Sequence, residues 1–409
     1  MKASRIEAHL RRCPILAERN ALLACDYCSP AVNTGAGETE LDAELEEAEP
    51  FDEWKFAARV LRAHAAAGAI AACVAAGAGG ADGDRTSADP PGDETGAAAS
   101  ALGGGRTGKA RHQEQRDAIA ARMVSMGLLN QGHTLVEYGA GNGELALTIM
   151  LRAEAEVSGE TAAEVKGEKA AGAKAQLGSV CLVDSAKSPA KNADGRLRGL
   201  LAGSSPALAP PARITGWRPK NGGGAGGSGG GGGTGGDIGG ACFARVRMGL
   251  EDLELAKLAE RIAPGRHTLL VAKHLCGAAT DYALRSAVAL RAAGAPPAAV
   301  LIGTCCHHRC DFRAYPNRPF LCRLGFVHRA DFEALCRVSS WSSVSTAATS
   351  ERAYVGACAK ALLDEGRAEY LRAHGFQATL SRYVNVSVSP ENMLLTATAV
   401  VTAGMPAAQ

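Results

Sequence analysis

The chain has 409 residues, of which 46% are hydrophobic and 4% aromatic, with 50 glycines and a formal net charge of +2. This length exceeds that of one minimal domain, so we expect one larger domain with an appendage and insertions. A net charge so near zero does not by itself mark a nucleic-acid-binding protein. No apolar run reaches the ~18 residues of a membrane span or resembles the core of a signal peptide. We therefore expect a soluble intracellular protein, cytoplasmic or nuclear, without membrane contact.

The N-terminal region contains a pattern typical of metal ligands. His9 and Cys13 are four residues apart and would share one face of a helix, which is the spacing of half a zinc site. Cys25 and Cys28 can complete a four-ligand set, although a chance pair is an equal alternative in a chain with 13 cysteines. In the absence of a secretion signal we expect all of these thiols to stay reduced.

Low-complexity segments separate the parts of the chain. Residues 38–53 carry nine acidic side chains and no basic one, and a helix is expected at residues 54–64. The Gly/Ala/Asp-rich sequence that follows, up to about residue 108, has the composition of a disordered linker. Residues 153–177 and 185–240 have the composition of surface insertions.

The remaining sequence alternates between short apolar runs and helical patterns, which predicts a parallel α/β sheet. A strand, a glycine turn and a helix start are expected at 134–152, after a helix at 112–126. Further strands are expected at 179–184, 244–248, 267–273 and 298–304, with helices at 252–262 and 278–293. The C-terminal segment predicts two antiparallel strands joined by a short turn at 389–391. This element order is that of the class I (Rossmann-like) methyltransferase fold, in contrast to a dinucleotide dehydrogenase.

A cofactor site is expected beyond the carboxyl ends of these strands. Gly139, Gly141 and Gly143 allow a sharp turn and close approach of a ligand, although a tight strand-to-helix turn without a ligand is the alternative. Glu137 can hold that turn or the ammonium group of S-adenosylmethionine. Asp184 ends the second strand, where a carboxylate binds ribose hydroxyls, or is simply solvated. Asp252, after the third strand, can face the adenine or cap a helix.

Polar side chains are concentrated at the ends of the fourth and fifth strands. The fourth ends in Lys273-His274, and the fifth is followed by Cys305 and Cys306 and then by His307, His308 and Asp311. The histidines suit acid–base chemistry or phosphate contact, and Lys273 can stabilise a developing alkoxide. Zinc is an alternative, but adjacent residues can share one ion only where the backbone is irregular. We therefore favour simple burial for the two cysteines.

With these motifs assembled, the chain resembles the family of tRNA 2′-O-methyltransferases that modify the fourth nucleotide of the acceptor stem, the tRNA:m(4)X enzymes. The resemblance lies in the motifs VEYGAGNGEL, VAKHLCGAATDYALR, TCCHHRCDFRAY, ALLDEGRAEYLRAHGF and RYVNVSVSPENMLL. The start, RIEAHLRRCP, is similar to the later half of the family's Cys-His-His-Cys finger. Asn142 and Gly249 depart from the family pattern, which favours Asp252 as the adenine-side carboxylate.

The resemblance implies S-adenosylmethionine as methyl donor, tRNA as substrate instead of DNA, and an N-terminal zinc module. It makes His9 and Cys13 the last two finger ligands, with the first two expected before Met1, so zinc binding is open. The expected domains are a partial finger and connector at 1–35, a linker at 36–108 and a methyltransferase domain at 109–403. The alternatives are methylation of a base nitrogen or a protein on the same fold, and an RNA-binding remnant with impaired catalysis.

Overall fold

The computed structural model describes most of the second half of the chain and several segments of the first. The described residues are 29, 32–34, 52–77, 108–130, 132–158, 177–186, 192–202, 243–344 and 350–400. The expected finger ligands His9 and Cys13, and the pair Cys25 and Cys28, lie outside these ranges.

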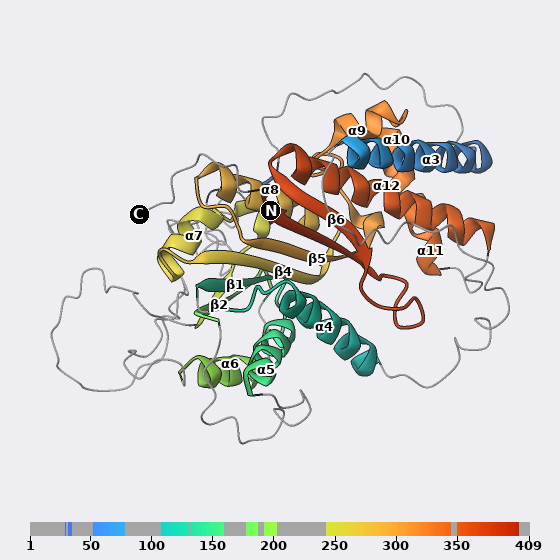
Figure 1. Cartoon of the computed structure of the whole chain (residues 1–409). Coiled ribbons are helices and arrows are strands. Elements are labelled where there is room, and N and C mark those ends of the chain that lie inside the picture. The colour runs from blue at the N-terminus through green and yellow to red at the C-terminus, as the bar shows by residue number, and fades with distance from the viewer. Residues whose placement is uncertain are drawn as a thin grey trace, which may run out of the picture.

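A seven-stranded sheet forms the centre of the molecule (Figure 1). Its strands lie in the order β3-β2-β1-β4-β5-β7-β6. The first five are parallel, whereas β7 runs antiparallel to both of its neighbours. The strands are β1 (His133–Tyr138), β2 (Ser179–Asp184), β3 (Phe243–Arg247), β4 (His267–Cys276), β5 (Ala299–Cys305), β6 (Phe376–Arg382) and β7 (Met393–Ala399). The expected parallel sheet ending in an antiparallel pair is therefore confirmed.

The connection between the last two strands differs from the expected short turn at 389–391, which is wrong. Strand β6 ends at Arg382 and β7 begins at Met393, so residues 383–392 form a longer loop. Asn385 organises this loop, because its side-chain Oδ1 accepts a hydrogen bond from the Ser387 amide and its carbonyl accepts one from the Val388 amide. A side chain that replaces backbone partners in this way stabilises an irregular loop.

Helices α4 (Gly108–Ser125), α5 (Glu144–Ser158) and α6 (Asn192–Ala202) cover one face of the sheet (Figure 1). Ile119 and Met123 of α4 and Ile149 of α5 are fully buried in a core shared with β1, β2 and β4. Helix α6 lies inside the stretch 185–240 that composition assigned to an insertion. It packs into the same core through side chains at helical spacing, namely Ala193, Leu197, Leu200 and Leu201.

The opposite face is covered by α7 (Leu255–Ile262), α8 (Ala278–Ala292) and α12 (Glu351–Ala373). The helix expected at 252–262 is split, since the 3₁₀ turn η1 (Leu250–Asp252) precedes α7. Alternation along the strands separates the two cores: Val136 and Tyr138 face α8, whereas Leu135 faces α4 and α5. The Tyr138 hydroxyl lies 2.9 Å from Ser286 Oγ on α8, so this buried polar group is paired.

A third core lies on the outer side of α12. It joins α3 (Glu53–Gly77) with η2 (His307–Arg309), α9 (Arg318–Arg323), α10 (Arg329–Ser339) and α11 (Trp341–Val344). Helix α3 is longer than the expected 54–64, and Arg59 Nη1 donates to Asp331 Oδ1 of α10 at 2.8 Å. None of the helices in the described part of the chain is long and apolar enough to cross a membrane.

Candidate functional site

The turn between β1 and α5 has the backbone geometry that requires glycine. Gly139, Gly141 and Gly143 all have positive φ angles, of 60°, 47° and 76°. A Cβ atom on Gly143 would lie 2.7 Å from Leu182 Cδ1, so a side chain there would have to displace the buried Leu182. A Cβ atom on Gly141 would meet nothing within 4 Å. The turn is therefore packed behind Gly143 and open beside Gly141, which leaves room for a ligand against the backbone.

Glu137 is buried beneath this turn and holds the start of α5. Its Oε2 accepts a hydrogen bond from the Ala146 amide at 2.9 Å, which satisfies one of the unpaired donors in the first turn of the helix. Burial raises the pKa of Glu137 to about 8, although this bond and the charges of Arg245 and Arg116 act in the opposite direction. A ligand cation beside this carboxyl would favour its ionised form.

Asp184, at the end of β2, also binds the glycine turn. Its Oδ2 accepts from the Gly141 amide and its Oδ1 from the Ala186 amide, both at 2.7 Å. Each carboxylate oxygen has a further lone pair, so these bonds leave room for a ribose hydroxyl. Arg245 of β3 completes the arrangement, donating to the Gly141 carbonyl at 2.9 Å and forming two bonds to Asp194 of α6. Sequence reasoning missed Arg245 because its partners are distant in the chain.

Asp252 lies in η1, shortly after β3, and Ser29 and Asn33 dock against this turn. The buried Asn33 side chain donates to the carbonyls of Leu250 and Leu253 at 2.6 and 2.8 Å. The Asn33 amide also donates to the Glu251 carbonyl, and the Ser29 amide to the carbonyl of Asp252. Ser29 and Asn33 therefore fix the backbone of the loop on which Asp252 stands.

Lys273 and His274, near the end of β4, meet His112 of α4. Lys273 Nζ lies 3.2 Å and His274 Nε2 lies 3.1 Å from the same atom, His112 Nδ1. The two imidazole rings are almost perpendicular, with centroids 4.9 Å apart. Sequence reasoning had Lys273 and His274 but missed His112, which is separated from them by more than 160 residues.

Neighbouring strand residues normally point to opposite faces, so the approach of both side chains to His112 needs an irregular backbone. His274 has a φ of 63°, in the left-handed region that non-glycine residues rarely adopt. The β4–β5 register also shifts between Lys273 and Leu275. Such bulges and strained residues redirect side chains near functional sites.

The surroundings of this cluster favour uncharged forms of its members. Burial, reinforced by the charge of Arg116, lowers the pKa of Lys273 to about 8. Burial and the neighbouring Lys273 and His112 lower the pKa of His274 to about 4. Near neutral pH, His274 is therefore uncharged, and about a tenth of Lys273 is neutral, which is far more than for an amine with an ordinary lysine pKa. A half-buried amine with such a pKa can accept a proton from a substrate.

His307 lies apart from this cluster, within a buried charge network. Its Nε2 bonds Asp364 Oδ1 at 2.8 Å, and the side chain is only 2% exposed. Asp364 also accepts from the Thr304 hydroxyl at 2.7 Å and from Arg367 Nη1 at 3.0 Å. Arg367 in turn makes two bonds to Asp281, which stands in the first turn of α8. The network ties the end of β5 to α8 and α12, and its burial keeps His307 from a bound substrate.

The other two expected side chains after β5 are exposed, but they differ in role. The His308 ring stands in η2 and is open to solvent. Asp311 caps the following turn, since its Oδ1 accepts from the Arg313 and Ala314 amides at 2.9 and 3.1 Å. Cys305 is buried, as expected, whereas Cys306 is only partly buried.

The fold and the site together define a class of protein: a mostly parallel sheet with a terminal antiparallel hairpin and a glycine turn after its first strand fits a methyltransferase-like fold. Residues 114–350 and 342–398 match the family described as "Methyltransferase TRM13". The chain belongs to this family. No solved structure matches the chain.

Curated relatives support this membership. A "tRNA:m(4)X modification enzyme TRM13" from Eremothecium gossypii is 33% identical over 172 residues, covering 37% of this chain and 38% of the relative. The protein of that name from Yarrowia lipolytica is 26% identical over 319 residues, covering 70% of this chain and 58% of the relative. A human protein named as its homolog is 26% identical over 236 residues, covering 38% and 49%. The chain thus spans about half the length of these relatives.

Proposed function

We propose that this chain is a tRNA methyltransferase that transfers a methyl group from S-adenosylmethionine to a ribose 2′-hydroxyl of nucleotide 4 in the acceptor stem. The family match and the printed names of the relatives support tRNA and position 4. The observation that carries the chemistry is Lys273, an amine with a pKa lowered to about 8 at the carboxyl end of β4. Only RNA has the 2′-hydroxyl, so DNA is not a substrate in this proposal.

The glycine turn fits a bound S-adenosylmethionine within a class I, Rossmann-like fold. Gly141 offers open space beside the backbone, and Gly139 and Gly143 allow the turn that creates it. In the proposed site Glu137 faces the cofactor's cationic end, Asp184 takes ribose hydroxyls, and Asp252 stands on the adenine side. When bound, the cofactor supplies an electrophilic methyl group on a sulfonium centre.

In the proposed mechanism, Lys273 and the residues around it prepare the hydroxyl for attack. The neutral Lys273 Nζ would accept the proton of the ribose 2′-hydroxyl and so activate its oxygen, while the cofactor would supply the methyl group from its sulfonium sulfur and leave as the thioether. His112 keeps the amine oriented, because its Nδ1 lies 3.2 Å from Lys273 Nζ. His274 holds His112 in turn, with its Nε2 3.1 Å from the same Nδ1 atom. The exposed His308 contacts the RNA backbone. His307 and Asp311 act as positioning residues, through the Asp364 network and the turn after η2.

We further propose that the methyltransferase domain spans residues 109–403, with insertions around 153–177 and 185–240 and a linker at 36–108. Residues 1–35 would form the partial finger and its connector, with His9 and Cys13 as zinc ligands. Asn33 supports a connector role, because it is hydrogen-bonded to the loop after β3. Through the same hydrogen bonds Asn33 also holds the proposed adenine side of the site.

Incubation of the full chain with tritiated S-adenosylmethionine and total tRNA, followed by nucleotide mapping, tests the proposal. We expect label in an alkali-resistant dinucleotide that contains nucleotide 4, because 2′-O-methylation blocks alkaline cleavage. Label on a base or in protein would refute the ribose assignment. Failure to label any substrate, with intact tRNA binding, would indicate an RNA-binding remnant.

Lys273→Met identifies the group that takes the proton. We expect this variant to lose methyltransferase activity while it still binds the cofactor and tRNA. His328→Ala, on the loop before α10, is the control and should keep its activity. A Lys273→Met variant with normal turnover would remove Lys273 from the mechanism.

A further inference from the structure

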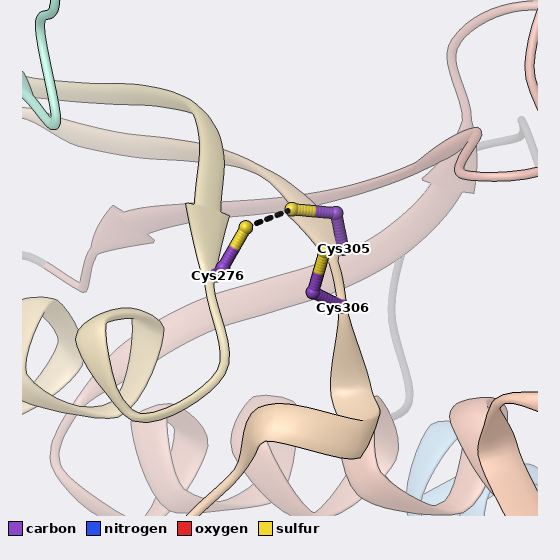
Figure 2. A group of neighbouring side chains, drawn as sticks. All are labelled: Cys276, Cys305 and Cys306. Atoms are coloured by element: carbon purple, nitrogen blue, oxygen red, sulfur yellow. Dashed lines mark hydrogen bonds between the residues drawn. The ribbon is translucent and has the colours of Figure 1, made fainter.

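Three cysteine side chains come together where β4 and β5 end (Figure 2). Cys276 is the last residue of β4, Cys305 is the last residue of β5, and Cys306 follows it. The Sγ atoms of Cys276 and Cys305 are 3.5 Å apart, and all three sulfur atoms lie within 4.8 Å of one another. None of these thiols takes part in the proposed methyl transfer.

The backbone around this thiol cluster is irregular in a way that brings the third sulfur in. Cys305 and Cys306 are adjacent, so in a regular strand their side chains would point to opposite faces. Cys306 instead has φ and ψ of 48° and 45°, the left-handed conformation that non-glycine residues rarely adopt. Figure 2 shows the Cys306 sulfur on the same side as those of Cys276 and Cys305. The irregular backbone that a shared ion requires is thus present.

We propose that Cys276, Cys305 and Cys306 bind one zinc ion as thiolates. A tetrahedral zinc site with Zn–S bonds of about 2.3 Å has S···S edges of about 3.8 Å. The Sγ atoms of Cys276 and Cys305, 3.5 Å apart, are close to this spacing. The three sulfur atoms lie within 4.8 Å of one another, so binding one ion would require them to move together only slightly. Three sulfur ligands favour a soft or borderline ion such as zinc over magnesium or calcium. Each thiol releases its proton to solvent when the ion binds.

A disulfide explains the cluster less well. Cys276 and Cys305 are register partners on adjacent parallel strands, and their sulfur atoms are 3.5 Å apart. A disulfide would require this distance to shorten to about 2.05 Å. It would also leave Cys306 with no reason for its left-handed conformation. An ion uses all three sulfurs and gives that conformation a cause.

The zinc ion would connect the two strand ends that carry the polar residues of the site. Cys276 follows the bulge that orients Lys273 and His274, and Cys306 precedes η2 with His307 and His308. Among the described residues no fourth His, Cys, Asp or Glu joins the three. The fourth position would then be filled by water or a ligand oxygen, as in zinc sites with three protein ligands.

Metal analysis of the purified full chain tests this site independently of any methyltransferase activity. We expect Cys306→Ser and Cys305→Ser to contain one zinc ion per chain fewer than the wild type by mass spectrometry of the metal content. Cys322→Ser, a partly buried cysteine on α9, is the matched control and should keep the wild-type content. Any zinc held by the N-terminal cysteines is present in all variants and cancels in the difference. Equal content in all four proteins would overturn the proposal.

A labelling experiment on the wild type guards against misfolding of the variants. Cys276 and Cys306 should resist alkylation by N-ethylmaleimide in zinc-loaded protein and react after a chelator removes the ion. Cobalt(II) added to the zinc-free chain should give a thiolate charge-transfer band that is weaker in Cys306→Ser than in the wild type, whereas Cys322→Ser should keep the wild-type intensity. Alkylation unaffected by the chelator would refute zinc binding, as would a Cys276–Cys305 disulfide that only a reductant opens.

Discussion

Arg367 should be the most sensitive polar residue for stability in the described part of the chain. Its guanidinium is 1% exposed and lies between Asp281 and Asp364, which are 0% and 2% exposed. Arg367→Met keeps much of the apolar stem but leaves the buried Asp281 carboxylate without its ion-pair partner and Asp364 with only His307 and Thr304. Removing one partner of a buried ion pair costs about 3–5 kcal/mol, and we expect the upper end of this range because two carboxylates are affected.

Urea denaturation of the wild type and the Arg367→Met variant measures this loss as a lower midpoint at constant slope. The control is Arg329→Met, which removes an exposed pair with Glu333 on α10 and should cost only about 0.5 kcal/mol. Adding Asp281→Asn to Arg367→Met should recover part of the lost stability, since one unpaired charge is removed. If Arg367→Met and Arg329→Met cost the same, the assigned importance of the buried network is wrong.

Three further predictions concern the candidate site. If Lys273 accepts the proton with a pKa of about 8, turnover should rise with pH and level off above about pH 8. A turnover that falls as the pH rises through 8 would instead show that the protonated amine is the active form. Glu137 has a folded-state pKa raised to about 8 from 4.5, so its contribution to stability is full below pH 4.5 and is lost as pH rises towards 8. The free energy of unfolding of Glu137→Gln, measured by urea denaturation, should therefore increase relative to that of the wild type as pH rises through this range, by up to about 1.4 kcal/mol per pH unit. A difference between the two proteins that does not change with pH would contradict the raised pKa. Asn33→Ala should weaken S-adenosylmethionine binding about tenfold by calorimetry with little change in melting temperature, and unchanged affinity would show that the loop after β3 holds its shape without Asn33.

Most of the sheet could be predicted because its strands are short apolar runs with clear boundaries. The strand SVCLVD, for example, occupies 179–184 as expected, and its alternate side chains face two cores. Helix α6 was missed because glycine dominates the composition of 185–240, although its apolar residues have helical spacing. Composition averaged over a long stretch hid a short periodic segment. The loop at 383–392 was placed too far along the chain because Asn385 was not recognised as a turn residue.

The candidate site was predicted in its residue types but not in its contacts. Glycine turns and polar strand ends can be read from local sequence, and Glu137 holds the start of α5 after the turn, which is close to one of its two expected roles. The bond from the Gly141 amide to Asp184 was not expected. His112 could not be found locally, because it reaches Lys273 only through the packing of α4 on the sheet. The left-handed residues His274 and Cys306 give no signal in sequence, since neither is a glycine. Their conformations decide which side chains converge.

The docking of Ser29 and Asn33 on η1 has a consequence for how the chain responds to its ligands. Asn33 holds the loop after β3 by three hydrogen bonds, and the Ser29 amide adds a fourth. Any event that pulls Ser29 and Asn33 away from η1 must break these bonds and release the loop. By reciprocity, a cofactor that favours the ordered loop also favours the docked segment. If Asp252 stands on the adenine side of the cofactor, as proposed above, occupancy of that site and docking of Ser29 and Asn33 on η1 are thermodynamically linked.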